Sequence, residues 1–367
     1  PMRNGNALAP RALSVSRCAP IDHAGPAPPV CDSRRRIDPA ENPQCKASAW
    51  RRAGAITPSR TVTTPAAPPP IPARPRRRPL WARSAAWRLK KAGTTSVRNT
   101  FEQIFRREEV KADFIEGDAF HRFDRQAMKD ELARRLAEGD QTFSHFSFDA
   151  NELEKLEEIF RIYGETGRGE TRHYVHDDRE AERWGTPPGT FTDWAPFEEG
   201  SDLLFYEGLH GAVVNDSVNL AGLADLKIGV VPVINLEWIQ KIHRDKASRG
   251  YSTDAVTDVI LRRMHAYVHV ICPQFTQTDI NFQRVPVVDT SNPFIARWIP
   301  TADESLVVIR FRNPRGIDFP YLLSMIHDSF MSRPNTIVCP GGKMALAMQL
   351  IITPLIWQLM DRKKKAH

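Results

Sequence analysis

Cysteine is scarce in this sequence, and no two cysteines have the spacing of a zinc finger. Only 5 occur among the 367 residues, and three of them precede residue 46. The other two, Cys272 and Cys339, lie in apolar stretches. This pattern excludes a zinc-finger protein. It is typical of a reducing compartment, so we expect buried thiols and a cytoplasmic protein.

Long uninterrupted apolar runs are also missing. The best candidate, residues 344–360, is short for a bilayer span and contains Gln349, Pro354 and Gln358. We therefore predict a core helix that is kinked at its proline, and no contact with a membrane.

Acidic residues are scarce in the first 80 positions, which hold 14 Lys and Arg against 4 Asp and Glu. The remaining positions hold 37 against 40. The net charge of +7 therefore belongs to the beginning of the chain, and the rest is nearly neutral. This balance argues against nucleic acid as a partner of the folded part.

The same first segment lacks apolar periodicity and holds 16 of the 29 prolines. Such a segment cannot bury enough surface to offset its chain entropy. We expect residues 1–91 to be a disordered leader and residues 92–367 to form the folded domain. A cleavable transit peptide and an upstream stretch translated in the wrong frame are two further interpretations of the leader.

From about Ala92 onwards, short apolar runs alternate with helical patterns. Strands are expected within the stretches 111–118, 202–211, 223–236, 305–312 and 335–340. Helices are expected within the stretches 125–140, 150–164, 236–250 and 253–271. This alternation predicts an α/β fold, a three-layer sandwich around a largely parallel sheet.

The stretch "KAGTTSVRNTFEQIF" has features of a phosphate-binding loop that runs into a helix. Gly93 can supply the turn, and Thr94, Thr95 and Ser96 offer hydroxyls to a phosphate or a metal. A helix N-terminus attracts phosphate through its free N–H groups and its dipole. Small hydroxyl residues also cap helices for purely structural reasons, so this stretch alone leaves both interpretations open.

Two of the expected strands end in acidic residues. After the first, in "EGDAFHR", Asp118 could accept a proton from a substrate hydroxyl while His121 and Arg125 hold a phosphate. The second ends at Glu207, whose carboxylate could hold Mg²⁺. Ligands of such sheets bind at the carboxyl ends of the strands. The structural alternative is a pair of solvated turns, the first with its aspartate as a helix cap.

The helix expected within 236–250 carries four charged residues at spacings that can share one side: Lys241, Arg244, Asp245 and Arg249. This run is either a solvated face or a cationic lid over transferring phosphates. Phosphoryl transfer depends on such charge because catalysis works mainly by positioning and electrostatic stabilisation. Taken together in chain order, these groups predict a kinase that acts on a phosphorylated small molecule.

Longer motifs make the sequence resemble bacterial-type phosphoribulokinases from about Ala92 to the C-terminus. They include "AGTTSVRNTFEQIFRRE", "IEGDAFHRF", "LLFYEGLHGAVVN", "VINLEWIQKIHRDKASRGYS" and "QTDINFQRVPVVDTSNPFIARWIPTADES". The resemblance implies an adenylate-kinase-like P-loop kinase that uses ATP and Mg²⁺. It implies that D-ribulose 5-phosphate is the substrate and ribulose 1,5-bisphosphate the product, as in Calvin cycle carbon fixation.

The resemblance also implies a role for each candidate residue. Asp118 is the expected general base, and Glu207 is the acid linked to the metal, with Thr95 as a second contact of that ion. Lys241 is expected to supply the charge of the lysine that the family's loop lacks, and Asp245 a second acid role. The expected substrate contacts are His121, Arg125, Arg244 and Arg249, and the expected nucleotide contacts are Gly93, Thr94, Thr95 and Ser96.

Similar bacterial enzymes form homo-oligomers and respond to NADH and AMP. Arg107 and Arg310 match positions tied to this effector response, although each could equally make a surface or interface salt bridge. Plant-type members carry a regulatory cysteine pair near the phosphate loop and beyond the base. The present chain has no cysteine between Cys45 and Cys272, which argues against thioredoxin control of that type.

The chain departs from the family before the residue Gly93. Members begin with a strand of the type "ISVTG" and a loop of the type "SSGAGTTS", whereas this chain keeps only "AGTTS" and has Lys90 and Lys91 at small-residue positions. The sheet should then lack its first strand unless residues 84–89 substitute for it. Bulky side chains block the approach of backbone N–H groups to phosphate, so we expect severely weakened ATP binding.

Three interpretations follow from this departure. The chain is an active phosphoribulokinase whose first residues are misread, or a catalytically impaired subunit that binds effectors in an oligomer. A third interpretation, nucleic-acid binding through the basic leader, predicts salt-sensitive binding that is lost when residues 1–80 are deleted.

Overall fold

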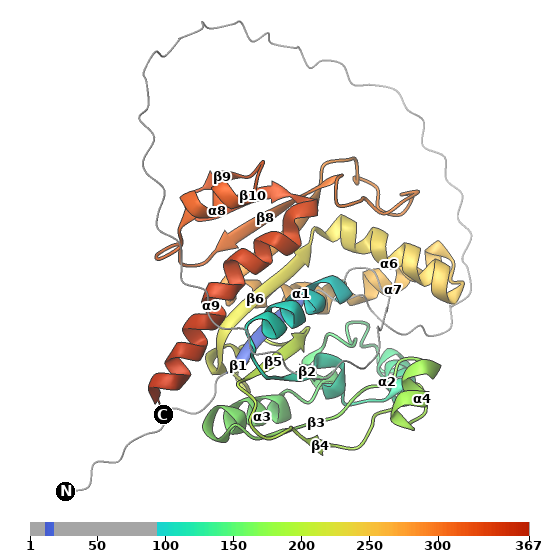
Figure 1. The fold of residues 1–367 in the computed structure, drawn as a ribbon. Coiled ribbons are helices and arrows are strands. Elements are labelled where there is room, and N and C mark those ends of the chain that lie inside the picture. Colours follow the sequence, from blue (N-terminus) through green and yellow to red (C-terminus); the bar gives the residue numbers. More distant parts are fainter. Residues whose placement is uncertain (1–11, 18–93, 367) are drawn as a thin grey trace, which may run out of the picture. The chain divides into compact units, whose positions relative to one another are not determined.

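The structure is a computed structural model that describes residues 12–17 and 94–366 (Figure 1). An eight-stranded sheet has the order β2-β5-β1-β6-β7-β8-β10-β9. Neighbours from β2 to β7 pair in parallel, and those from β7 to β9 are antiparallel. This mixed, mostly parallel sheet confirms the expected α/β class. Its strands are β1 (Ala12–Arg17), β2 (Ala112–Glu116), β5 (Leu203–Gly208), β6 (Ala224–Pro232), β7 (Ile280–Pro286), β8 (Ser305–Phe311), β9 (Phe330–Arg333) and β10 (Thr336–Pro340).

The helices expected from the sequence are present, and local signals fix their ends. The Asp124 side chain accepts hydrogen bonds from the first backbone N–H groups of α2, and Gly250 ends α6 in the left-handed conformation that glycine favours. The short strands β3 (Glu170–Thr171) and β4 (Ala195–Pro196) form a separate two-stranded antiparallel sheet. The helices are α1 (Thr94–Arg107), α2 (Arg125–Ala137), α3 (Leu153–Thr166), α4 (Asp178–Trp184), α5 (Leu220–Leu223), α6 (Ile234–Arg249), α7 (Thr253–Ala266), α8 (Phe319–Met325) and α9 (Met344–Ala366).

Alternate residues of β5 face two different cores, which makes the sheet the middle of three layers. Leu203 and Phe205 pack in the larger cluster with residues of α1 and α9. Leu204 and Tyr206 point the other way and pack in a second cluster with residues of α3. Successive side chains of a strand point to opposite faces of a sheet, so a strand that is apolar at every position is covered on both sides.

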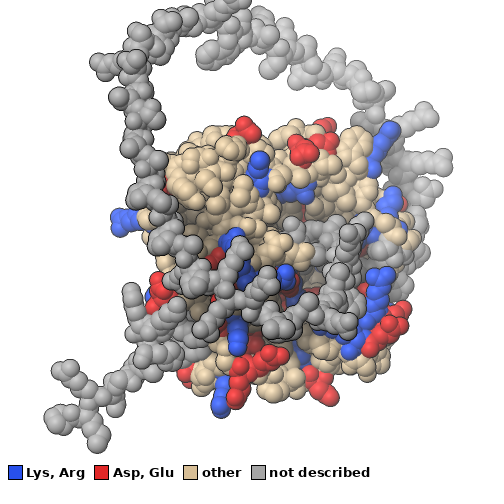
Figure 2. Space-filling view, in the orientation of Figure 1, with Lys and Arg blue, Asp and Glu red and all other residues tan. Residues whose placement is uncertain are grey.

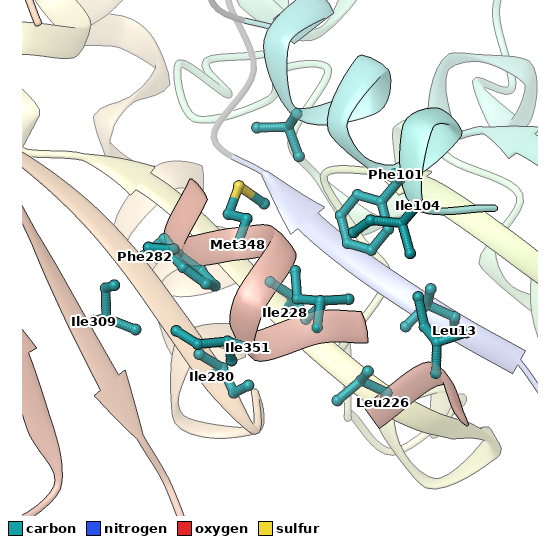
Figure 3. Packing of buried hydrophobic residues seen from close by; sticks show 14 of the residues in the cluster. Leu13, Phe101, Ile104, Leu226, Ile228, Ile280, Phe282, Ile309, Met348 and Ile351 are labelled. Carbon is teal, nitrogen blue, oxygen red and sulfur yellow. The ribbon is translucent and has the colours of Figure 1, made fainter. Parts of the chain in front are cut away.

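The first strand of the sheet is present, and this corrects the expectation that it is missing. Ala12–Arg17 forms β1 and pairs in parallel with both β5 and β6. Leu13 is fully buried against Phe101 and Ile104 of α1 (Figure 3), and the Ser14 hydroxyl donates to the Gly211 carbonyl at 2.7 Å. Residues 84–89, the substitute considered from the sequence, lie outside the described residues.

The C-terminal apolar stretch belongs to the core, as expected. One helix, Gly341–Arg362, is long and apolar enough by length and composition to cross a membrane. Its buried face includes Met348, Ile352 and Ile356 and packs in the larger cluster, and Figure 1 shows α9 lying beside α1. In its most apolar window 39% of the helix is buried, and the buried part packs in the core.

Two further expectations concern the thiols and the surface charge. Cys339 is fully buried, as expected, whereas Cys272 is only partly buried; neither is in a disulfide. On the face drawn in Figure 2, Lys and Arg side chains of the described part are interspersed with Asp and Glu. This distribution agrees with the nearly balanced charge of the folded domain.

Candidate active site

Two acidic residues end neighbouring parallel strands at the same edge of the sheet. Glu116 of β2 and Glu207 of β5 are register partners, so their side chains leave the sheet on the same face. The chain then turns at two glycines that nearly touch. A Cβ added to Gly117 would lie 2.7 Å from the Cα of Gly208, so only glycine allows the two strand ends to come this close.

Asp118 follows directly, in the 3-10 turn Gly117–Phe120, which together with His121 is called the Asp118 turn below. The Asp118 side chain is 43% exposed and faces two histidines. Its Oδ1 lies 3.7 Å from His121 Nε2, and its Oδ2 lies 3.5 Å from His176 Nε2. The structure therefore places the expected base beside an expected substrate contact, in a position that a ligand can reach.

Burial lowers the pKa of His121, and the Asp118 carboxylate only partly opposes this effect. The imidazole is thus biased towards its neutral form and can act as a hydrogen-bond donor or acceptor. Arg125 begins α2, and its guanidinium donates to the His176 carbonyl at 2.8 Å. Arg125 therefore holds the segment that brings His176 to Asp118, a contact that the sequence did not predict.

Arg98, on the first turns of α1, joins the helix to the acidic strand ends. It pairs with Glu116 and donates to Glu102 at 3.0 Å, and Glu207 lies within reach of its charge. Burial alone would raise the pKa of Glu116. His173 and Arg98 outweigh that effect and lower this pKa to about 2. Sequence reasoning missed Arg98 because Glu116, its partner at the site, lies on another element, β2.

The carboxylates of Glu116 and Glu207 suit a divalent cation, because Mg²⁺ prefers oxygen ligands. Within the described ranges, no group of three or more His, Cys, Asp or Glu residues could hold a metal ion by itself. An ion at the strand ends would complete its coordination with water and phosphate oxygens, which is the usual arrangement of Mg²⁺ in kinases. The residues present therefore fit the expected Mg²⁺.

The charged residues of α6 do not form the solvated face that was one of the two interpretations. Lys241 Nζ lies 2.6 Å from Asp245 Oδ2, and both side chains are only 5% exposed. Arg244 also pairs with Asp245, at 3.1 Å. Burial and the nearby Arg263 lower the pKa of Lys241 to about 8, although Asp245 opposes this shift. The side chain of Arg249 lies outside the described residues.

The expected nucleotide contacts are only partly described. Thr94 is the first residue of α1, which agrees with a helix that begins at the phosphate loop. Gly93 and the side chains of Thr94, Thr95 and Ser96 lie outside the described residues.

The two expected effector residues lie on different elements. Arg107, at the end of α1, donates to the Thr353 hydroxyl of α9 at 2.8 Å and pairs with Glu108 at 2.6 Å. Arg310 is exposed on β8, where it is in register with Asn281 and Thr336. The contacts of Arg107 fit the salt-bridge interpretation, and the effector roles stay predictions.

Comparisons with known proteins agree with this geometry. The model of the Phosphoribulokinase / Uridine kinase family matches residues 90–291. Phosphoribulokinase 1 of Cereibacter sphaeroides is 76% identical over 275 residues, which are 75% of this chain and 95% of that protein. The phosphoribulokinase of Nitrobacter vulgaris is 70% identical over 275 residues, which are 75% of this chain and 95% of that protein.

A solved structure, the phosphoribulokinase from Rhodobacter spheroides, superposes with a TM-score of 0.70 at 73% identity and covers 74% of this chain and 96% of that one. The family match begins at residue 90, so most of the expected leader has no counterpart in it. With more than half of its residues matched by the family and with such similar relatives, this chain belongs to the phosphoribulokinases.

Proposed function

We propose that the chain transfers the γ-phosphoryl group of ATP to a hydroxyl of D-ribulose 5-phosphate and so forms ribulose 1,5-bisphosphate for Calvin cycle carbon fixation. The curated relatives, named phosphoribulokinases, support the reaction. The observation that carries the assignment is Asp118, which stands at a strand end between His121 and His176 with its carboxylate open to a ligand.

In this proposal Asp118 is the general base. One of its Oδ atoms accepts the proton of the attacking hydroxyl while the oxygen–phosphorus bond forms and the bond to the ADP leaving group breaks. His121 and Arg125 bind the 5-phosphate, because a neutral imidazole and a guanidinium both donate to phosphate oxygens. The 43% exposure of Asp118 fits a group that must meet a diffusing substrate.

The remaining candidates surround the transferring phosphates. When bound, Mg²⁺ neutralises phosphate charge, and Glu207 with Thr95 would hold it. Lys241, with a pKa lowered to about 8, keeps its proton through most of the neutral range and can place a positive charge on the phosphates. Arg244 and Arg249 extend this charge as substrate contacts, and Asp245 orients Lys241 at 2.6 Å. ATP would lie on Gly93, Thr94 and Ser96.

A second candidate function is a catalytically impaired subunit. The end of β1 and the start of α1 are joined by residues 18–93, where the family has a short glycine-rich loop. Lys90 and Lys91 precede Gly93 in this linker. The impaired subunit would keep the Asp118 side of the site and bind ATP weakly.

The finer expectations accompany the main proposal. The chain would act in the cytoplasm on small metabolites, as a homo-oligomer without nucleic-acid or membrane partners. NADH would activate it through Arg107 and Arg310.

The test is ATP-dependent phosphorylation of D-ribulose 5-phosphate with Mg²⁺, for the full chain and for Asp118→Asn. Loss of a general base should lower turnover about 10²–10⁴-fold and leave binding of the sugar phosphate unchanged in calorimetry. Asp149→Asn is the matched control, because this carboxylate is 69% exposed and contacts Arg135 rather than the histidines. Equal loss of turnover and of sugar-phosphate binding in Asp118→Asn would instead give Asp118 a structural role. A full chain without turnover that still binds the sugar phosphate would favour the impaired subunit.

A further inference from the structure

One arginine spans the Asp118 turn from outside. Arg172, which lies just after β3, donates through Nε to the Ala119 carbonyl at 2.7 Å and through its terminal nitrogen to the His121 carbonyl at 3.0 Å. Its side chain is only 13% exposed. Both accepting carbonyls belong to the turn that carries Asp118, so the guanidinium holds that backbone at two points.

Aromatic rings fix the guanidinium in turn. Its central carbon lies 3.9 Å from the ring centre of Phe191 and 4.8 Å from that of Trp194. Trp194 packs edge-on against Phe120 of the Asp118 turn, with ring centres 5.5 Å apart. Stacking on aromatic faces and a rigid fork of donors are properties of arginine that lysine lacks.

The segment that Arg172 begins also carries His176 to Asp118. The His173 carbonyl accepts from the Thr192 N–H, and the Val175 N–H donates to the Thr190 carbonyl. The His173 N–H donates to the Thr192 hydroxyl. Arg172 therefore lies where the two halves of the candidate sugar-phosphate site meet: the turn with the base, and the segment with the second histidine.

We infer that Arg172 is the positioning residue of Asp118. The inference rests on the proposed function, because it assigns to Arg172 the task of holding the base in its reactive place. Arg172 does not face the base carboxylate itself, since its two shortest hydrogen bonds go to backbone carbonyls. A displacement of about 1 Å in a reacting group can cost about 100-fold in rate. An enzyme whose Asp118 turn loses one of these hydrogen bonds should therefore turn over slowly while it binds the sugar phosphate normally.

The test compares Arg172→Lys with Lys155→Met, in the full-length chain. Lysine keeps the positive charge but cannot reach both carbonyls in the geometry of the fork. We expect kcat to fall about 100-fold, with unchanged KM for D-ribulose 5-phosphate and unchanged ATP binding. Lys155 stacks on the same Trp194, at 3.5 Å, and pairs with Glu170; neither of these two partners belongs to the Asp118 turn. Its variant should keep the parent kcat.

A double variant separates positioning from a general structural role. If Arg172 acts through Asp118, then Arg172→Lys should slow the Asp118→Asn enzyme no further, because residues that act as one unit are not additive. Additive losses, an unchanged kcat in Arg172→Lys, or a rise in KM that matches the fall in kcat would each overturn the inference.

Two results distinguish a failure of this inference from a failure of the proposed function. Full turnover of Asp118→Asn would overturn the general-base role that the proposed function gives to Asp118, whereas loss of turnover there with a normal Arg172→Lys enzyme would overturn only the inference. If Arg172→Lys fails to fold by circular dichroism, Phe191→Leu replaces it, since that change removes the ring under the guanidinium and keeps an apolar side chain. It should lower kcat at constant KM, and an unchanged kcat would again overturn the inference.

Discussion

The ends of β5 and β6 differ from the end of β1, although β1 lies between these two strands. β5 itself ends in the site, at Glu207 and Gly208. After β6 it enters α6, which carries the buried pair of Lys241 and Asp245. After β1, residues 18–93 intervene before α1 begins at Thr94. Of these three strands, β1 is therefore the one whose candidate site residues, at the start of α1, do not follow the strand directly.

The difference shows that the sugar-phosphate side and the nucleotide side of the site depend on different stretches of the sequence. On the sugar-phosphate side, a strand, a glycine turn and an acid follow one another within a few residues, so the chain carries Asp118 directly from the end of β2 into the site. On the nucleotide side, the strand and the helix must first meet across a long linker. Closing a longer loop costs little extra entropy, which explains how β1 can still occupy its place. The strand β1 can therefore take its place in the sheet in a chain whose sequence keeps only "AGTTS" of the family's phosphate loop.

The largest expected effect comes from restoring the direct connection. We predict that replacing residues 18–91 with a short glycine-rich loop, while keeping β1, tightens ATP binding strongly. Two regained charge-assisted hydrogen bonds at about 1.5–3 kcal/mol each correspond to about 100-fold or more in the dissociation constant. Calorimetry with ATP and Mg²⁺ measures the change.

Binding of D-ribulose 5-phosphate is the internal control for that experiment, since the Asp118 side should be the same in both proteins. Equal ATP affinity of the two proteins would contradict the prediction and remove the main argument for an impaired subunit.

An effect of intermediate size is expected for the buried pair of Lys241 and Asp245 on α6, which follows β6. The effect is on the stability of the fold. Lys241→Met leaves the Asp245 carboxylate, only 5% exposed, with Arg244 but without its buried lysine. Breaking a buried pair in this way should lower the free energy of unfolding by about 3 kcal/mol, measured by urea denaturation. Lys155→Met is the control, because its ion pair with Glu170 is at the surface and should be worth about 0–1 kcal/mol. If both variants lose the same free energy of unfolding, the pair on α6 stabilises the fold no more than a surface ion pair does.

Much of this molecule could be predicted from its sequence, and the failures have physical reasons. The helix α3 follows from the helical spacing of its apolar residues, which are buried in the structure: Leu153, Leu156, Ile159, Phe160 and Tyr163. The strand ends at Glu116 and Glu207 follow from the acids after apolar runs. β1 was missed because six residues carry little periodic signal, and Ser14 meets Gly211 across 197 positions. The burial of Lys241 depends on packing, which helical spacing does not reveal. Arg172 was missed because its two shortest hydrogen bonds go to backbone carbonyls, which have no signature in the residue types.

The smallest expected effect concerns Glu116, at the end of β2, and appears only in acid. Its pKa is about 2 in the folded chain against an ordinary value of 4.5, so the folded state binds this proton less readily than the unfolded state. The resulting stabilisation is fully present above pH 4.5 and is lost as the pH falls through 2. The difference in unfolding free energy between the parent and Glu116→Gln should therefore be constant above pH 5 and shrink below pH 4.5. Glu102→Gln removes the other, more exposed acid partner of Arg98 and should differ little from the parent at any pH. A Glu116→Gln difference that stays constant down to pH 2 would mean that Arg98 and His173 do not hold this carboxylate ionised, and that the β2 strand end is less rigidly arranged than its neighbour at β5.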